Sequence, residues 1–269
     1  MTPDIDWEDA FSNGDYIENA ADFPPMWSEQ AAQFRASVRG RLDLAYGDAP
    51  REKLDLFLPN EKPKGLIVFV HGGYWQAFDK SSWSHLARGP IEHGWAVAMP
   101  SYTLAPEAKI PEITAQIGRA VSMVANEVAG PIRLTGHSAG GHLVSRMGCD
   151  DTPLLATVTT RIDKIASISG VHDLRLLLRH SMNGKLGLMK ETAHAESPSL
   201  RAPYKGFDFT AWVGACERPE FLRQSALITE NWSRAGVPAR LVADPGKHHF
   251  DVIDGLADAD HPLCLSLTS

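Results

Sequence analysis

The feature that most constrains this chain is a G-x-S-x-G pattern in which Ser138 stands between Gly136 and Gly140. An apolar run at residues 132–135 precedes it, and a helix-compatible segment at 141–147 follows. In a strand, tight turn and helix of this kind, the serine hydroxyl is exposed at the end of the strand. Larger residues at the two glycine positions would collide with the adjoining strand and helix. The alternative is a glycine-rich turn with an ordinary serine, because the pattern alone is common.

The length and composition favour one domain spanning residues 1–269. The chain has 43% hydrophobic residues, enough for one sizeable core, and lacks a linker, repeat or low-complexity segment. Residues 1–35 are rich in aromatic side chains and are expected to pack on the body of the protein. Covering part of a substrate site is the alternative role for this segment. The irregular residues 173–205 are interpreted as a cap-like insertion over the edge of the site.

The hydrophobic pattern predicts an α/β fold. Polar and apolar residues alternate at 41–47 and 53–59, which predicts two half-buried strands paired antiparallel across a turn. The runs at 66–70 and 96–99 are solidly apolar, as strands covered on both faces must be. Because further strands alternate with helices, we expect a mostly parallel sheet with helices on both faces. These strands are expected at 132–135, 164–170, 209–214 and 239–243, and the helices at 112–128 and 219–234.

Charge and cysteine content exclude several classes of protein. The net charge is −7 and no basic cluster is present, so no nucleic-acid partner is expected. The apolar run at 66–70 is far shorter than the about 20 residues needed to cross a bilayer, and no membrane association is expected. Residues 1–6 are acidic and do not resemble a signal peptide.

The odd number of widely spaced cysteines argues against disulfides and zinc and favours a cytoplasmic location (Cys149, Cys216 and Cys264). The sequence leaves a homodimer open.

A nucleophilic serine requires a base and an acid that orients the base. In hydrolases with this turn, the acid and then the histidine follow the serine along the chain. Glu217 lies just after the predicted strand at 209–214 and is the predicted acid. The other carboxylates that follow strands remain rivals for this role (Glu220, Asp173 and Asp244).

The predicted base is His249, in the loop after the last strand. His248 adjoins it and is an alternative base. A metal site at this pair is disfavoured, because no further ligands follow at suitable spacing.

The segment His-Gly-Gly-Tyr-Trp at 71–75 follows a buried strand and predicts donors for an oxyanion. Two glycines let the backbone bend so that the N–H groups of Gly73 and Tyr74 join that of Ala139 in the site. Tyr74, Trp75 and His137 are the candidate substrate contacts. Core packing of the tryptophan and loop orientation by the histidine are the structural alternatives.

Together these motifs resemble the kynurenine formamidase (arylformamidase) group within the esterase/lipase branch of the α/β-hydrolases. Residues 71–75 match its HGG-x-W motif, and the hairpin at 46–56, the turn at 136–140 and the segments at 214–225 and 249–251 are similar. The resemblance covers roughly residues 40–255. The acid position of this group is usually Asp, whereas Glu217 occupies it here.

The resemblance implies a single-domain α/β-hydrolase fold and hydrolysis of a formamide on an aromatic amine, N-formylkynurenine being the type substrate. Ser138, Glu217 and His249 would act through an acyl-enzyme, with no metal and no organic cofactor. A general short-chain carboxylesterase or lipase-like enzyme is the first alternative. Acyl transfer to an acceptor other than water would use the same residues. A non-catalytic binding protein with the hydrolase fold is the alternative from a different class.

Overall fold

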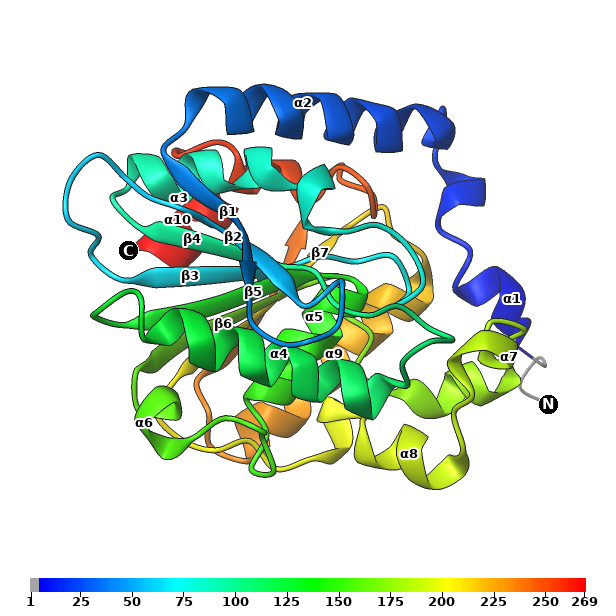
Figure 1. Cartoon of the computed structure of the whole chain (residues 1–269). Helices are drawn as coiled ribbons and strands as arrows, with labels where there is room; N and C mark the ends of the chain where they lie inside the picture. Colours follow the sequence, from blue (N-terminus) through cyan, green and yellow to red (C-terminus); the bar gives the residue numbers. More distant parts are fainter. Residues whose placement is uncertain (1–4) are drawn as a thin grey trace.

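The computed structural model describes residues 5–269, so the first four residues, on which the absence of a signal peptide was partly argued, lie outside the described part. One sheet has the strand order β1-β2-β4-β3-β5-β6-β7-β8 (Figure 1). β1 pairs with β2, and β2 with β4, antiparallel, while every later pair is parallel. This confirms the predicted sheet. The strands are β1 (Gly40–Ala45), β2 (Lys53–Phe57), β3 (Leu66–Val70), β4 (Ala96–Pro100), β5 (Ile132–His137), β6 (Ile162–Ile168), β7 (Asp208–Gly214) and β8 (Ala239–Asp244).

Helices cover both faces of the sheet, as predicted (Figure 1). Successive residues of β3 enter two different cores: Val68 belongs to the core under α4, α5 and α9, and Ile67 to the core under α2, α3 and α10. This alternation follows from the two-residue period of a strand, and it explains why β3 is apolar throughout. The helices are α1 (Trp7–Ala10), α2 (Phe23–Ser37), α3 (Arg88–Glu92), α4 (Ile110–Ala125), α5 (Ala139–Met147), α6 (Ala156–Thr159), α7 (Asn183–Leu186), α8 (Lys190–Ala195), α9 (Pro219–Arg234) and α10 (Pro262–Thr268).

The prediction that both N-terminal strands are half-buried is wrong. In β2, all four residues from Leu54 to Phe57 are buried, whereas β1 lies at the edge of the sheet and is mostly exposed. The polar residue that suggested an outer face, Asp55, is covered by the loop after β3. Lys80 of that loop places its Nζ 2.7 Å from Asp55 Oδ1, so the buried charge has a counter-ion.

The N-terminal segment packs on the protein body, and most of it is helical. Trp27 and Phe34 of α2 are buried in the second core, and Phe11 is buried in the main core. The helix α2 itself was not predicted, because its few apolar residues give only a weak helical stripe.

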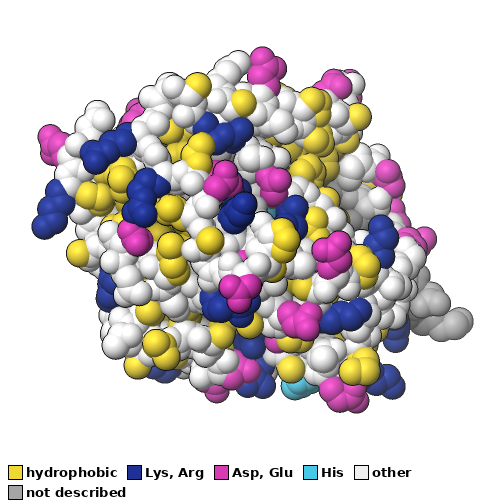
Figure 2. All heavy atoms as spheres, in the orientation of Figure 1, with side chains coloured by type: hydrophobic (Ala, Val, Ile, Leu, Met, Phe, Trp, Pro, Cys, Tyr) yellow, Lys and Arg dark blue, Asp and Glu magenta, His cyan; other side chains and the backbone are white. Residues whose placement is uncertain are grey.

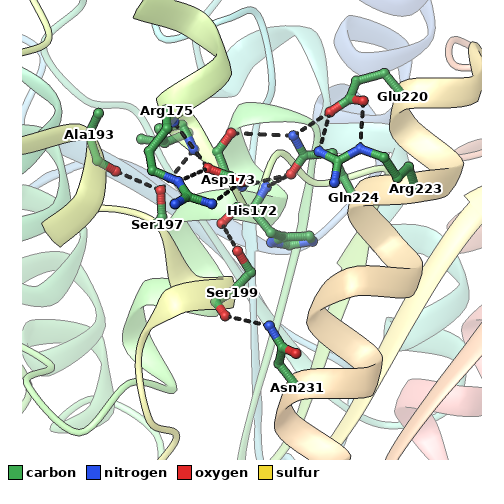
Figure 3. A network of polar contacts seen from close by, with 11 residues as sticks. His172, Asp173, Arg175, Ala193, Ser197, Ser199, Glu220, Arg223, Gln224 and Asn231 are labelled. Atoms are coloured by element: carbon green, nitrogen blue, oxygen red, sulfur yellow. Dashed lines mark hydrogen bonds and ion pairs between the residues drawn. The ribbon is translucent and has the colours of Figure 1, made fainter. Parts of the chain in front are cut away.

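Residues 173–205 form short helices that are tied to α9 (Figure 3). Gln224 of α9 is fully buried, and its Oε1 accepts the backbone N–H groups of His172 and Asp173, each at 2.7 Å. The Ser199 hydroxyl donates to the His172 carbonyl at 2.8 Å. A buried amide that satisfies two backbone donors holds the start of this insertion firmly on the body.

The surface carries charge of both signs. Figure 2 shows basic and acidic side chains intermingled on the face seen in Figure 1. Exposed ion pairs also occur, for example between Arg41 and Glu127 at 2.6 Å. Pairs of this kind add little stability. Because acidic side chains lie between the basic ones, the described residues on the face drawn in Figure 2 form no large basic patch. Separately, none of the helices in residues 5–269 is long and apolar enough to span a membrane.

Candidate active site

Ser138 occupies a strained turn between β5 and α5. Its backbone angles are φ 54° and ψ −115°, a conformation that non-glycine residues rarely adopt. A Cβ at Gly140 would lie 1.9 Å from the carbonyl oxygen of Val70, and one at Gly136 would lie 2.4 Å from the carbonyl oxygen of Gly140. Both positions therefore require glycine, because a side chain would collide with backbone. The turn places the serine at the carboxyl end of β5, and backbone strain of this kind clusters at functional sites.

The loop after β3 lies directly against this turn. A Cβ at Gly72 would sit 3.1 Å from the Cβ of Ser138. Tyr74 and Trp75 have positive φ angles of 49° and 58°, so the loop is strained as well. Within residues 5–269, the N–H groups of Gly73, Tyr74 and Ala139 donate no hydrogen bond. The three predicted oxyanion donors thus have no hydrogen-bond acceptor within residues 5–269, and two of them, Gly73 and Tyr74, line the same cavity as Ser138.

Glu217 and His249 form a buried pair. The Nδ1 atom of His249 lies 2.6 Å from Oε2 of Glu217, and the two side chains are 4% and 0% exposed. Glu217 comes from the loop after β7 and His249 from the loop after β8, so neighbouring parallel strands deliver them to the same edge of the sheet. The other carboxylate oxygen, Oε1, accepts the Gly214 N–H at 2.7 Å and also the Ser169 hydroxyl.

The alternatives that the sequence left open have other partners. The Nδ1 atom of His248 lies 3.0 Å from Asp251 Oδ1, and its ring packs edge-on against Phe23. Each rival carboxylate is also engaged: Glu220 with Arg223 at 2.7 Å, Asp173 with Arg175 at 2.8 Å, and Asp244 with the Trp212 indole at 3.0 Å.

Ser138 and His249 line one small cavity of about 200 Å³. Five of its 13 lining residues are Trp, Tyr or Phe, and part of the wall comes from the N-terminal segment through Asn13, Pro24 and Trp27. None of residues 173–205, all of which the structure describes, lines it. The N-terminal segment therefore covers the candidate site as well as packing on the body. The aromatic wall consists of Trp27, Tyr74, Phe78, Trp83 and Phe250.

Two of the predicted substrate contacts line this cavity and one does not. Tyr74 lies in its wall, and its hydroxyl donates to the Phe11 carbonyl at 2.5 Å, which ties the N-terminal segment to the loop after β3. Trp75 is fully buried in the main core, with its ring edge-on to His142. The left-handed backbone at Tyr74 and Trp75 gives the two side chains these separate places, so Trp75 is not in reach of a ligand in the cavity.

His137 lines the cavity and also holds the loop that carries His249. Burial keeps the pKa of His137 well below the ordinary value for histidine, because a buried ring is desolvated and desolvation disfavours its charged form. Its Nε2–H donates to the His249 carbonyl oxygen at 2.9 Å. His71 plays a similar part in the loop after β3: burial lowers its pKa to about 4, and its Nδ1–H donates to the Gly72 carbonyl at 2.8 Å.

Several residues at this site were missed from the sequence, among them Trp27 and Ser169. The aromatic-rich composition of the N-terminal segment suggested that this segment could cover a site, but nothing in the sequence pointed to Trp27 in particular. Ser169, at the end of β6, had none, because a serine after an apolar strand is common and only the fold brings it to Glu217. Among residues 5–269, no group of three His, Cys, Asp or Glu side chains is arranged to hold a metal ion.

Comparisons with known proteins agree with this architecture. A kynurenine formamidase from Danio rerio is 29% identical over 96% of this chain and 89% of that protein, and one from Salmo salar is 28% identical over 96% and 90%. A crystal structure of a provisionally assigned thioesterase from Silicibacter sp. tm1040 superposes with a TM-score of 0.94 and 51% identity, covering 99% of this chain and all of that one. Esterase B from Lactobacillus rhamnosis shares the fold, with a TM-score of 0.71 at 18% identity over 92% and 91% of the two chains.

The sequence also matches a known protein family. The sequence pattern of the BD-FAE family matches residues 54–199, more than half of the chain, including the loop after β3 and the turn at Ser138. The chain is therefore an α/β-hydrolase of the arylformamidase/esterase type and a member of the BD-FAE family.

Proposed function

We propose that this chain is a serine hydrolase that cleaves small aryl formamides or esters, with kynurenine formamidase-like activity. The observation that carries the proposal is the buried Glu217–His249 pair, whose histidine shares a cavity with Ser138. The kynurenine formamidases that match nearly the whole chain support the formamide assignment.

The mechanism follows from the positions of these groups. His249 takes the proton of the Ser138 hydroxyl as that oxygen attacks the acyl carbon, and Glu217 stabilises the imidazolium. The N–H groups of Gly73, Tyr74 and Ala139 donate to the oxyanion, and each such donor is typically worth about 10²–10³ in rate. His249 then protonates the leaving group, and water repeats the cycle on the acyl-enzyme.

The cavity favours a small substrate with an aromatic part. Its volume of about 200 Å³ is below the roughly 300–1,000 Å³ of typical ligand sites. The Trp27 and Trp83 rings, with centroids 4.7 Å apart, form one side of it. Aromatic walls bind aryl groups through burial and edge-to-face contacts, so an aryl formamide or a short ester fits better than a long acyl chain.

A thioester is the second candidate substrate, because a 51% identical protein of the same length carries a provisional thioesterase assignment. The same serine, histidine and oxyanion donors serve for thioester hydrolysis.

Substrate profiling of the purified chain tests the proposal. We expect kcat/KM to be highest for N-formylkynurenine, lower for p-nitrophenyl acetate and lowest for p-nitrophenyl butyrate. A short acyl thioester measured in parallel separates the second candidate. Absence of turnover on all four, together with no labelling by a fluorophosphonate probe, would instead favour the non-catalytic binding protein.

Trp27 is expected to limit the size of the substrate that the cavity accepts. Replacing it by alanine removes an indole from the cavity wall, so activity on p-nitrophenyl butyrate relative to acetate should rise by about tenfold, the usual value of one or two methylenes in a fitted pocket. Phe34→Ala is the matched control, since it truncates an aromatic residue of the same helix and core that does not line the cavity. An unchanged ratio in Trp27→Ala, measured by initial rates, would count against this role.

A further inference from the structure

The Glu217 carboxylate has a partner that the mechanism above does not use. The Ser169 hydroxyl donates to Oε1 of Glu217, which also accepts the Gly214 N–H at 2.7 Å. The other oxygen, Oε2, lies 2.6 Å from His249 Nδ1. Ser169 is fully buried, and so is the Glu217 side chain, so water does not compete for these bonds. Donors on Oε1 leave Oε2 as the oxygen that faces the imidazole.

The backbone at Ser169 is strained. It has a φ of 52°, in the left-handed region that serine seldom occupies. Its N–H donates to the Trp212 carbonyl of β7 at 2.7 Å, so the residue is held against the strand that leads to Glu217. Strain of this kind persists where surrounding contacts fix the conformation, and it gathers at functional sites.

The loop after β6 is also tied to α9, the helix that follows Glu217 (Figure 3). Gln224 accepts the N–H groups of His172 and Asp173, a few residues after Ser169. Gln224 belongs to α9, which begins at Pro219, two residues after Glu217. The same helix therefore holds both the loop that carries Glu217 and the loop after β6. In this way it fixes the distance between the Ser169 hydroxyl and the Glu217 carboxylate.

A glutamate in this position needs such restraint. Its side chain has one more rotatable bond than aspartate, and freezing that bond costs conformational entropy. The Glu217 side chain folds back over Gly214, where a Cβ would come within 3.2 Å of its Cγ. A charge-assisted hydrogen bond from Ser169 to Oε1 then fixes the rotation of the carboxylate plane.

We propose that Ser169 is a positioning residue that orients Glu217 for its hydrogen bond with His249. The inference rests on the proposed function, since it presumes that Glu217 serves the reaction. Ser169 does not line the cavity, so it acts on turnover through the carboxylate and leaves substrate binding unchanged.

The first test separates kcat from KM in two variants. Ser169→Ala should lower kcat about 10–100-fold with little change in KM, the usual effect of losing a hydrogen bond to a buried charge. Ser169→Gly should lower kcat equally, although glycine adopts the positive φ without strain. Ser167→Ala is the matched control: its buried hydroxyl, on the strand that leads to Ser169, lies 3.3 Å from His172 Nε2, and kcat should stay within about twofold.

A double-mutant cycle supplies the second test. In a Glu217→Gln background, Ser169→Ala should change kcat by less than about threefold, because the carboxylate through which it acts is gone. Any of three results would overturn the inference alone. They are wild-type kcat in both Ser169 variants, full activity of Ser169→Gly, or an effect of Ser169→Ala in the Glu217→Gln background as large as in the parent chain. Full activity of Glu217→Gln would overturn the assignment of the acid itself, and the inference with it.

Discussion

Replacing Ser138 by alanine is expected to lower kcat by about 10⁴–10⁶-fold and to abolish labelling by a fluorophosphonate probe. The variant lacks the only atom proposed to form the acyl-enzyme, while the N–H groups of Gly73, Tyr74 and Ala139 remain to support a small residual rate. The substrate should still bind, because the aromatic cavity wall is intact. Steady-state kinetics and probe labelling on one protein preparation give both readouts.

A matched control for Ser138→Ala is available in α5, the helix that follows Ser138. Ser145 is also a fully buried serine, but its hydroxyl donates to the Gly141 carbonyl at 2.8 Å and does not line the cavity. Ser145→Ala should therefore keep both activity and labelling. Retention of turnover by Ser138→Ala, with thermal unfolding like that of the parent chain, would exclude the proposed nucleophile.

The second large effect is expected from the two adjacent histidines. His249→Gln should lower kcat by about 10⁴-fold or more, since it removes the base that is 2.6 Å from Glu217 and shares the cavity with Ser138. His248→Gln should change kcat by no more than about twofold, because that ring is half-buried, pairs with Asp251 at 3.0 Å and lies outside the cavity lining.

The comparison of these neighbours is informative because both substitutions keep a polar side chain of similar size. Circular dichroism and the unfolding midpoint, measured for each variant, separate loss of chemistry from loss of fold. The reverse pattern, an inactive His248→Gln and an active His249→Gln, would move the base to the other histidine and would conflict with the observed pairing of His249 with Glu217.

Most of the architecture could be predicted from local patterns in the sequence. Buried strands such as 66–70 must be apolar on both sides, so they can be recognised without knowledge of their neighbours. The helix predicted at 219–234 is present with the same bounds, because a proline near its start and an amphipathic pattern are local signals. The turn at Ser138 is local as well, since its glycines are required by backbone within a few residues and by β3.

Which distant side chains come into contact depends on how the chain folds in three dimensions, and no local pattern reveals it. The sequence could not separate His249 from His248, because adjacent loop residues differ only in the direction that the folded loop gives them. Nor could it bring Trp27 into the cavity or Ser169 to Glu217, since those contacts join segments far apart in the chain. The prediction that Trp75 contacts substrate failed for the same reason. The strained backbone after Gly73 places the Trp75 ring in the core and leaves Tyr74 at the site, and neither composition nor spacing predicts this backbone.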